Sequence, residues 1–173
     1  MSLSDLTLVL GGAASGKSAF AEGQITGSGR QPVYIATAQA FDAEMIAKIA
    51  AHQDMRGAGW RTIEEPTDLS AALAGASSDE AVLIDCATLW LTNLILADAD
   101  LDAAQEHLLA AIETCPAPVV IVSNEVGSGI VPDNALSRRF RNAQGRLNQA
   151  LAARADHVVA VMAGLPLTLK APK

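Results

Sequence analysis

Hydrophobic residues recur along the chain in short, nearly continuous runs, which are separated by longer segments with helical spacing. Runs of five or six residues rich in Val, Leu and Ile are typical of strands buried on both faces. The runs expected to form strands are residues 6–10, 32–36, 81–85, 118–123 and 157–162. The alanine-rich segments expected to form helices are residues 42–55, 88–97, 101–114 and 134–153.

The alternation of strands with helices predicts an α/β fold with a mostly parallel sheet that is covered on both faces, because parallel strands need crossover connections. Pro166 lies in the tail segment 164–170 and fits an edge strand, since proline cannot donate to a central ladder. There is no internal repeat or linker, so one domain over residues 1–173 is expected. Ligands of such sheets bind at the carboxyl ends of the strands.

The composition narrows the classes of partner. Half of the 173 residues are hydrophobic but only 3% are aromatic, so Ala, Val, Leu and Ile must fill the core. The formal net charge of −7 argues against binding of nucleic acid or anionic membranes. No basic leader segment precedes the first apolar run, and the longest apolar runs fall short of the ~20 residues that a membrane helix needs. A cytoplasmic protein is expected, with Cys86 and Cys115 as buried, reduced thiols.

A phosphate-binding loop follows the first predicted strand and opens a helix. Its sequence fits GxxxxGK[ST], in which small residues let backbone N–H groups surround phosphates. In this motif Lys17 reaches the terminal phosphates and the Ser18 hydroxyl is a ligand for Mg²⁺. The nucleotide-binding residues expected are Gly11, Gly12, Ala13, Ala14, Ser15, Gly16, Lys17 and Ser18. The motif predicts binding of a nucleoside triphosphate.

Two carboxylates follow other predicted strands. Asp85 closes one strand, where it would hold hydrated Mg²⁺ as a Walker B residue does, or instead cap the next helix. Glu125 follows residues 118–123 and emerges at the same edge of the sheet. It is a candidate general base or second metal contact, and a plain loop carboxylate is the alternative.

His52 and Arg56 lie on one face of the predicted helix 42–55, with Arg56 directly after its last residue. A neutral imidazole is a competent nucleophile towards phosphorus near pH 7, and a cation one turn away would stabilise charge on the attacked phosphate. The alternative is a histidine that caps or snorkels near a helix end. Residue chemistry alone does not decide between them.

The chain resembles the bifunctional adenosylcobinamide kinase/adenosylcobinamide-phosphate guanylyltransferase family of cobalamin synthesis. The resemblance is most specific in SNEVGSGIVPDN (123–134) and in the block HQDMRGAGWRTIEEP (52–66). The other matching stretches lie at 11–18, 34–45, 85–94, 138–156 and 164–170. Many relatives carry Arg in place of Ala14, Arg in place of Gln53 and Pro in place of Gly57. These differences do not affect the residues expected to carry the chemistry, which are Lys17, Ser18, His52, Arg56, Asp85 and Glu125.

The resemblance implies a RecA-like P-loop NTPase fold, a three-layer sandwich with a mostly parallel central sheet and an antiparallel edge strand near the C-terminus. It also implies phosphorylation of the aminopropanol hydroxyl of adenosylcobinamide by ATP or GTP. GMP then passes from GTP through a guanylyl-histidine, at the position of His52, to give adenosylcobinamide-GDP. Mg²⁺ would serve as cofactor, and relatives form homotrimers.

Several alternatives remain open from the sequence. A kinase-only enzyme would leave His52 structural, and a GTP-dependent regulatory switch would bind a protein partner without turnover. The switch lacks the NKxD guanine-specificity motif. A local positive patch comprises Arg138, Arg139, Arg141 and Arg146, which either bind corrinoid phosphate or a subunit, or form a solvated helical face.

Overall fold

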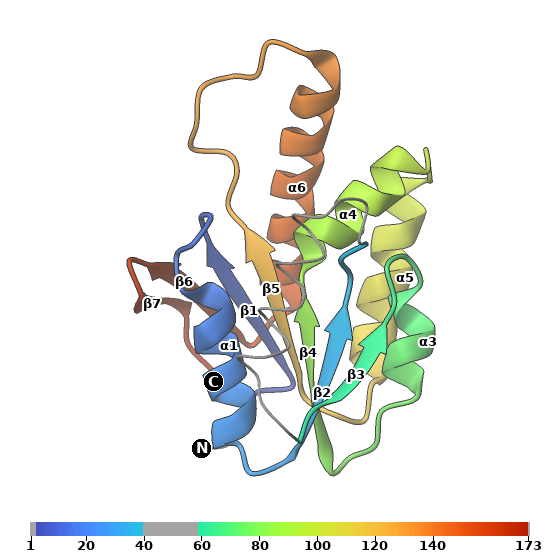
Figure 1. The fold of residues 1–173 in the computed structure, drawn as a ribbon, viewed down its shortest axis with the longest axis vertical. Helices are drawn as coiled ribbons and strands as arrows, with labels where there is room; N and C mark the ends of the chain where they lie inside the picture. Colours follow the sequence, from blue (N-terminus) through green and yellow to red (C-terminus); the bar gives the residue numbers. More distant parts are fainter. Residues whose placement is uncertain (1–2, 40–58, 173) are drawn as a thin grey trace.

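The computed structural model describes residues 3–39 and 59–172, which form a seven-stranded sheet flanked by helices (Figure 1). The strands are β1 (Leu6–Gly11), β2 (Gln31–Ala36), β3 (Arg61–Glu64), β4 (Glu80–Asp85), β5 (Val119–Asn124), β6 (His157–Met162) and β7 (Leu165–Lys170). The helices are α1 (Lys17–Gly27), α3 (Leu69–Ala74), α4 (Ala87–Leu96), α5 (Leu101–Thr114) and α6 (Ala135–Arg154). All five strands predicted from apolar runs are confirmed, whereas the predicted helix 42–55 falls outside the described residues.

The order of the strands is β3-β2-β4-β5-β1-β6-β7, and every neighbouring pair is parallel except β6 with β7. The mostly parallel sheet with an antiparallel C-terminal edge strand is therefore confirmed. Pro166 lies in β7 opposite Val161, at the edge where a missing N–H breaks no central ladder. The sequence pattern missed β3 and α3, because β3 is largely exposed and α3 spans only six residues.

The core forms two layers, one on each face of the sheet. Successive residues of β1 point to opposite faces, so Leu8 belongs to the core cluster that includes residues of α3, α4, α5 and α6, while Val9 belongs to the cluster that includes residues of α1. Figure 1 shows α1 on the face opposite to α5 and α6. Burial on both faces explains the nearly continuous apolar runs of the central strands. Among residues 3–39 and 59–172, no helix combines the length and the apolar character that crossing a bilayer demands.

Candidate active site

The phosphate loop joins β1 to α1 at the carboxyl edge of the sheet. Gly16 holds the N-cap position of α1 with φ +92°, a left-handed conformation that favours glycine. No side chain caps α1, and its first turn contains no acidic residue. The N-terminal amides of an uncapped helix and its dipole form a natural site for a phosphate group. The loop is therefore built to receive an anion.

Lys17 and Ser18 stand in the first turn of α1, both partly buried. Lys17 Nζ donates a hydrogen bond to the carbonyl oxygen of Gly12 at 3.0 Å. The ammonium group therefore lies over the loop that it is expected to serve. This position suits a cation that neutralises phosphate charge.

Asp85 lies at the end of β4, two strands from β1, with β5 between them. It does not cap α4, since Cys86 holds that N-cap position and no side chain caps the helix. The Tyr34 hydroxyl donates to Asp85 Oδ2 at 3.3 Å, and the Tyr34 ring meets Trp60 edge-to-face at 6.1 Å. The carboxylate is thus oriented by a buried tyrosine that sequence reasoning did not identify.

The backbone next to Asp85 is hydrogen-bonded to Thr37, the residue that follows β2. The buried hydroxyl of Thr37 donates to the Cys86 carbonyl at 2.8 Å and accepts from the Cys86 N–H at 2.8 Å. Asn93 Nδ2 donates to the Thr37 carbonyl at 2.8 Å. These bonds fix the carboxyl ends of β2 and β4 relative to each other. Because the partners are far apart in sequence, spacing gives no signal for them.

Glu125 follows β5 at the carboxyl edge of the sheet, as expected from the sequence, and lies next to the phosphate loop. Its N–H donates to the carbonyl of Gly11 at 3.1 Å. Its exposed carboxylate accepts a hydrogen bond from the N–H of Gly127, so it shapes its own loop in this structure. The position suits either a base or a loop carboxylate.

The segment after Glu125 projects beyond the sheet before α6 begins (Figure 1). Arg138 donates to the carbonyls of Pro132 and Asp133 at 2.9 and 2.7 Å, and Arg141 donates to that of Gly129 at 3.3 Å. Arg139 pairs with Asp98 at 3.4 Å. Three arginines of the positive patch therefore have internal partners, and two of them brace this projecting segment. His52 and Arg56 lie outside the described residues.

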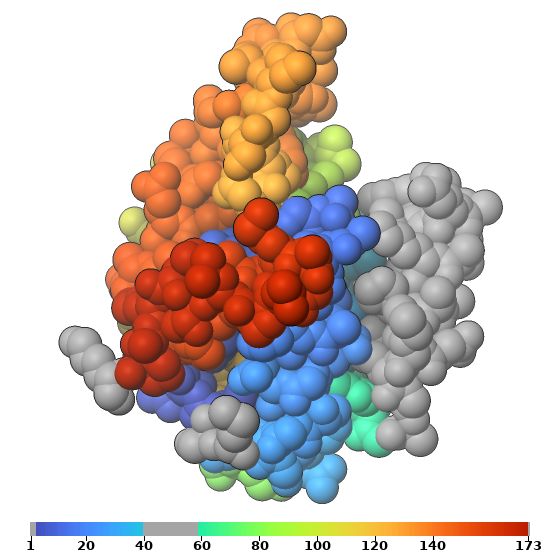
Figure 2. All heavy atoms as spheres, turned by 90° about the vertical axis from the view of Figure 1, so that its left-hand side faces the viewer, coloured from blue at the N-terminus to red at the C-terminus, as the bar shows by residue number. Residues whose placement is uncertain are grey.

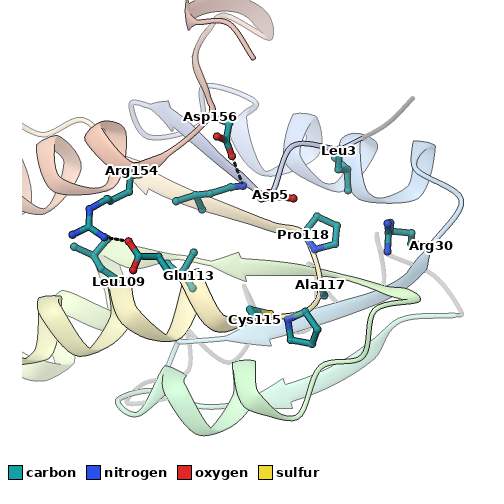
Figure 3. A pocket seen from close by; sticks show the side chains of 13 residues that line it. Leu3, Asp5, Arg30, Leu109, Glu113, Cys115, Ala117, Pro118, Arg154 and Asp156 are labelled. Carbon is teal, nitrogen blue, oxygen red and sulfur yellow. Dashed lines mark hydrogen bonds and ion pairs between the residues drawn. The ribbon is translucent and has the colours of Figure 1, made fainter. Parts of the chain in front are cut away.

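A cavity of about 390 Å³ lies at the opposite, amino-terminal edge of the sheet (Figure 3). Five charged side chains line it: Arg154 pairs with Glu113, Arg30 donates to the Ser78 carbonyl, Asp156 Oδ2 accepts from the Leu6 N–H at 3.1 Å, and Asp5 is the fifth. Both cationic side chains are therefore engaged, whereas binding of a phosphate group needs a cation that is not so committed. The cavity therefore does not compete with the phosphate loop as the active site.

The two cysteines differ in burial, and both thiols are free. Cys86 is buried as predicted, but Cys115 is only partly buried, because it lines the cavity at the amino-terminal edge. Burial, reinforced by the charge of Asp85, raises the pKa of the Cys86 thiol to about 11. Burial also raises the pKa of Cys115. Neither thiol is activated as a nucleophile at neutral pH.

We expect iodoacetamide at pH 8 to modify Cys115 in the folded protein and to reach Cys86 only after unfolding, because the reagent needs an accessible thiolate. Peptide mass spectrometry after timed alkylation checks the order of modification. Faster labelling of Cys86 than of Cys115 would contradict the burial of Cys86.

The raised pKa of Cys86 also affects stability. The unfolded Cys86 thiol titrates near its ordinary value of 9.0 and the folded one near 11. The unfolded state therefore binds fewer protons between these pH values, and this thiol lowers the free energy of unfolding as pH rises through that window.

Comparison with known proteins identifies a family and relatives that are similar to this chain. A family model described as cobinamide kinase / cobinamide phosphate guanyltransferase matches residues 7–169. The chain is 49% identical over 166 residues to the bifunctional adenosylcobalamin biosynthesis protein CobP of Pseudomonas aeruginosa, covering 94% of this chain and 96% of the relative. It is 44% identical over 181 residues to the bifunctional adenosylcobalamin biosynthesis protein CobU of Salmonella typhimurium, covering 95% and 99%.

A solved structure with a similar fold is the RadB recombinase, with a TM-score of 0.51 and 18% identity over 91% of this chain and 74% of that chain. At this identity the likeness concerns the fold alone. It confirms the expected RecA-like P-loop NTPase architecture.

Proposed function

The chain belongs to the cobinamide kinase / cobinamide phosphate guanyltransferase family, and we propose that its phosphate loop serves two successive transfers to one corrinoid. In the first, ATP or GTP phosphorylates the aminopropanol hydroxyl of adenosylcobinamide. In the second, GTP gives GMP to His52, which passes it to the phosphorylated corrinoid and yields adenosylcobinamide-GDP. The observation that carries the proposal is a phosphate loop that leads into the uncapped N-terminus of α1, with Asp85 at the same edge of the sheet, in a chain that the family matches over residues 7–169.

The kinase step needs mainly positioning and charge neutralisation. The amides of residues 11–18 hold the phosphates, and Lys17 balances the charge on the transferred group. The acceptor hydroxyl attacks the γ-phosphorus, the bond to the bridging oxygen breaks, and the nucleoside diphosphate leaves. Glu125, next to Gly11 at the edge of β5, would orient that hydroxyl and take its proton.

The residues at this edge fit Mg²⁺. Ser18 supplies a hydroxyl and Asp85 supplies a carboxylate that Tyr34 holds in place, and Mg²⁺ prefers such oxygen ligands together with water and substrate phosphates. When bound, the ion neutralises the phosphate oxygens and stabilises the departing group. Ser18 and Asp85 are the residues proposed to hold it.

The transfer of GMP proceeds through a covalent intermediate on His52. The imidazole attacks the α-phosphorus of GTP and pyrophosphate leaves. A phosphate oxygen of the corrinoid then attacks the same phosphorus, the P–N bond breaks, and the imidazole is regenerated. Arg56, one turn further along the predicted helix, would stabilise the charge on the attacked phosphate.

We also propose that the protein is a homo-oligomer, a trimer by family resemblance. The exposed edge strand β7 supports assembly, because Leu165, Leu167 and Leu169 are 57–73% exposed along one face of the strand. Light scattering coupled to size-exclusion chromatography measures the number of chains.

One assay separates the bifunctional enzyme from its alternatives. Adenosylcobinamide is incubated with the protein, ATP, GTP and Mg²⁺, and the corrinoids are identified by chromatography and mass spectrometry. We expect the phosphate to form first and adenosylcobinamide-GDP to follow. Accumulation of the phosphate alone would identify a kinase-only enzyme, and an unchanged corrinoid would favour a regulatory switch.

Replacing Asp85 with asparagine is expected to lower kcat for corrinoid phosphorylation by about 10²-fold or more, and added nucleotide should not restore it, because a charged metal ligand is lost. Tyr34→Phe is the graded comparison: it removes the hydroxyl that donates to the carboxylate and leaves the carboxylate itself in place, so a loss of about 2–10-fold is expected. Steady-state kinetics across a Mg²⁺ titration measure both effects. Normal turnover of Asp85→Asn at ordinary Mg²⁺ would remove the assigned role of Asp85.

A further inference from the structure

The turn between β6 and β7 lies against the phosphate loop. Ala163 and Gly164 form a two-residue connection with φ values of +51° and +78°, which is the sign pattern of a type I′ hairpin turn. Since β6 runs parallel to β1 and next to it, this turn emerges at the same edge of the sheet as the loop. Figure 2 shows the red C-terminal hairpin packed against the blue segment of the chain.

The contact between turn and loop is made by backbone atoms. The Gly164 N–H donates to the carbonyl oxygen of Ser15 at 2.8 Å. A Cβ atom on Gly16 would lie 3.1 Å from Gly164 Cα, and one on Gly11 would lie 2.7 Å from the Val161 carbonyl oxygen. The hairpin therefore touches the loop at both its start and its end. This close packing leaves no room for a side chain at Gly11 and little room for one at Gly16.

The hydrogen bond from Gly164 determines the direction in which the Gly16 N–H of the loop points. In a planar trans peptide the carbonyl of one residue and the N–H of the next point in opposite directions. Because the Ser15 carbonyl points to Gly164, the N–H of Gly16 points away from the hairpin. Gly16 is the N-cap of α1, where backbone N–H groups bind phosphate.

We propose that Gly164 is a positioning residue of the nucleotide site: its N–H holds the Ser15–Gly16 peptide so that the Gly16 N–H is available to the phosphates. This inference rests on the proposed function of the loop in binding nucleotide. It assigns the C-terminal hairpin a part in both reactions, since both use the same loop. The hairpin acts through the loop and not by touching substrate.

Two variants at Gly164 separate this role from simple support of the fold. Gly164→Pro removes the donor and cannot adopt the positive φ. Gly164→Asn keeps the donor, tolerates a left-handed backbone, and has room for its side chain, because a Cβ at this position meets no atom within 4 Å. The two variants therefore differ in whether the hydrogen bond to Ser15 can form and in whether the turn can keep its positive φ.

The measurements are the dissociation constant of a fluorescent ATP analogue, kcat and KM for both reactions, and the melting temperature. For Gly164→Pro we expect about tenfold weaker nucleotide binding and a matching rise in the nucleotide KM of both reactions. For Gly164→Asn we expect values within about twofold of the wild type. A folded Gly164→Pro with wild-type affinity would overturn the inference, as would an equal loss in Gly164→Asn.

Hydrogen exchange of the Gly164 amide keeps the test valid if the proline variant does not fold. In the wild-type enzyme we expect this amide to be protected, and to exchange more slowly still with the imido analogue of ATP bound. Exchange at the rate of an open turn would overturn the inference. Wild-type protein that binds no nucleotide would instead refute the proposed function of the loop, so the two failures are distinguishable.

Discussion

His52→Ala should abolish covalent capture of GMP while corrinoid phosphorylation continues. The alanine cannot form the P–N bond on which the second transfer depends, so formation of adenosylcobinamide-GDP should fall by more than about 10³-fold. The phosphate loop is untouched, so the kinase step should keep its kcat and KM. The product that accumulates is the phosphorylated corrinoid.

The measurement uses GTP labelled at the α-phosphate with Mg²⁺, followed by denaturation and counting of label on the chain. A phosphoramidate is labile in acid and stable in alkali, which identifies the bond. His107→Ala is the matched control, because His107 is an exposed histidine within α5 and should leave labelling intact. Label that persists in His52→Ala would assign the nucleophile to another residue.

Lys17→Ala should impair both reactions together. The Lys17 ammonium lies over the phosphate loop, 3.0 Å from the Gly12 carbonyl, and is the cation expected to neutralise the transferred and departing phosphates. Its loss should lower kcat/KM of each reaction by about 10²–10³-fold. Steady-state kinetics with each substrate measure the two losses separately.

Lys170→Ala is the control for the loss of a lysine. The Lys170 ammonium donates to the carbonyls of Ala152 and Ala153 at 3.2 Å, at the end of α6, and plays no part in the proposed chemistry. Its removal should leave both reactions within about twofold of the wild type. If Lys17→Ala left corrinoid phosphorylation intact, the phosphate loop would not be the shared site.

The sheet was predictable because each central strand is buried on both faces and therefore carries a continuous apolar run, as in residues 81–85. The phosphate loop was predictable because its chemistry is local: eight consecutive residues contain the glycines, the lysine and the hydroxyl. By contrast, β3 pairs only at the sheet edge and carries no apolar run, so periodicity does not mark it.

The contacts that orient the site residues could not be predicted in this way. Tyr34 reaches Asp85, and Gly164 reaches Ser15, only because the fold brings distant segments together. Neither pair has a characteristic spacing. The partners of the positive patch could not be predicted either, because the carbonyl groups that Arg138 contacts depend on the course of the segment before α6.

Competition by a single inhibitor tests most directly whether one nucleotide site serves both transfers. The imido analogue of ATP, whose γ-phosphate is not transferred, is titrated against ATP in the kinase assay and against GTP in the guanylylation assay. One shared site predicts competitive inhibition of both reactions with the same inhibition constant. Constants that differ by more than about tenfold, or about 1.4 kcal/mol, would show two separate sites and contradict this account.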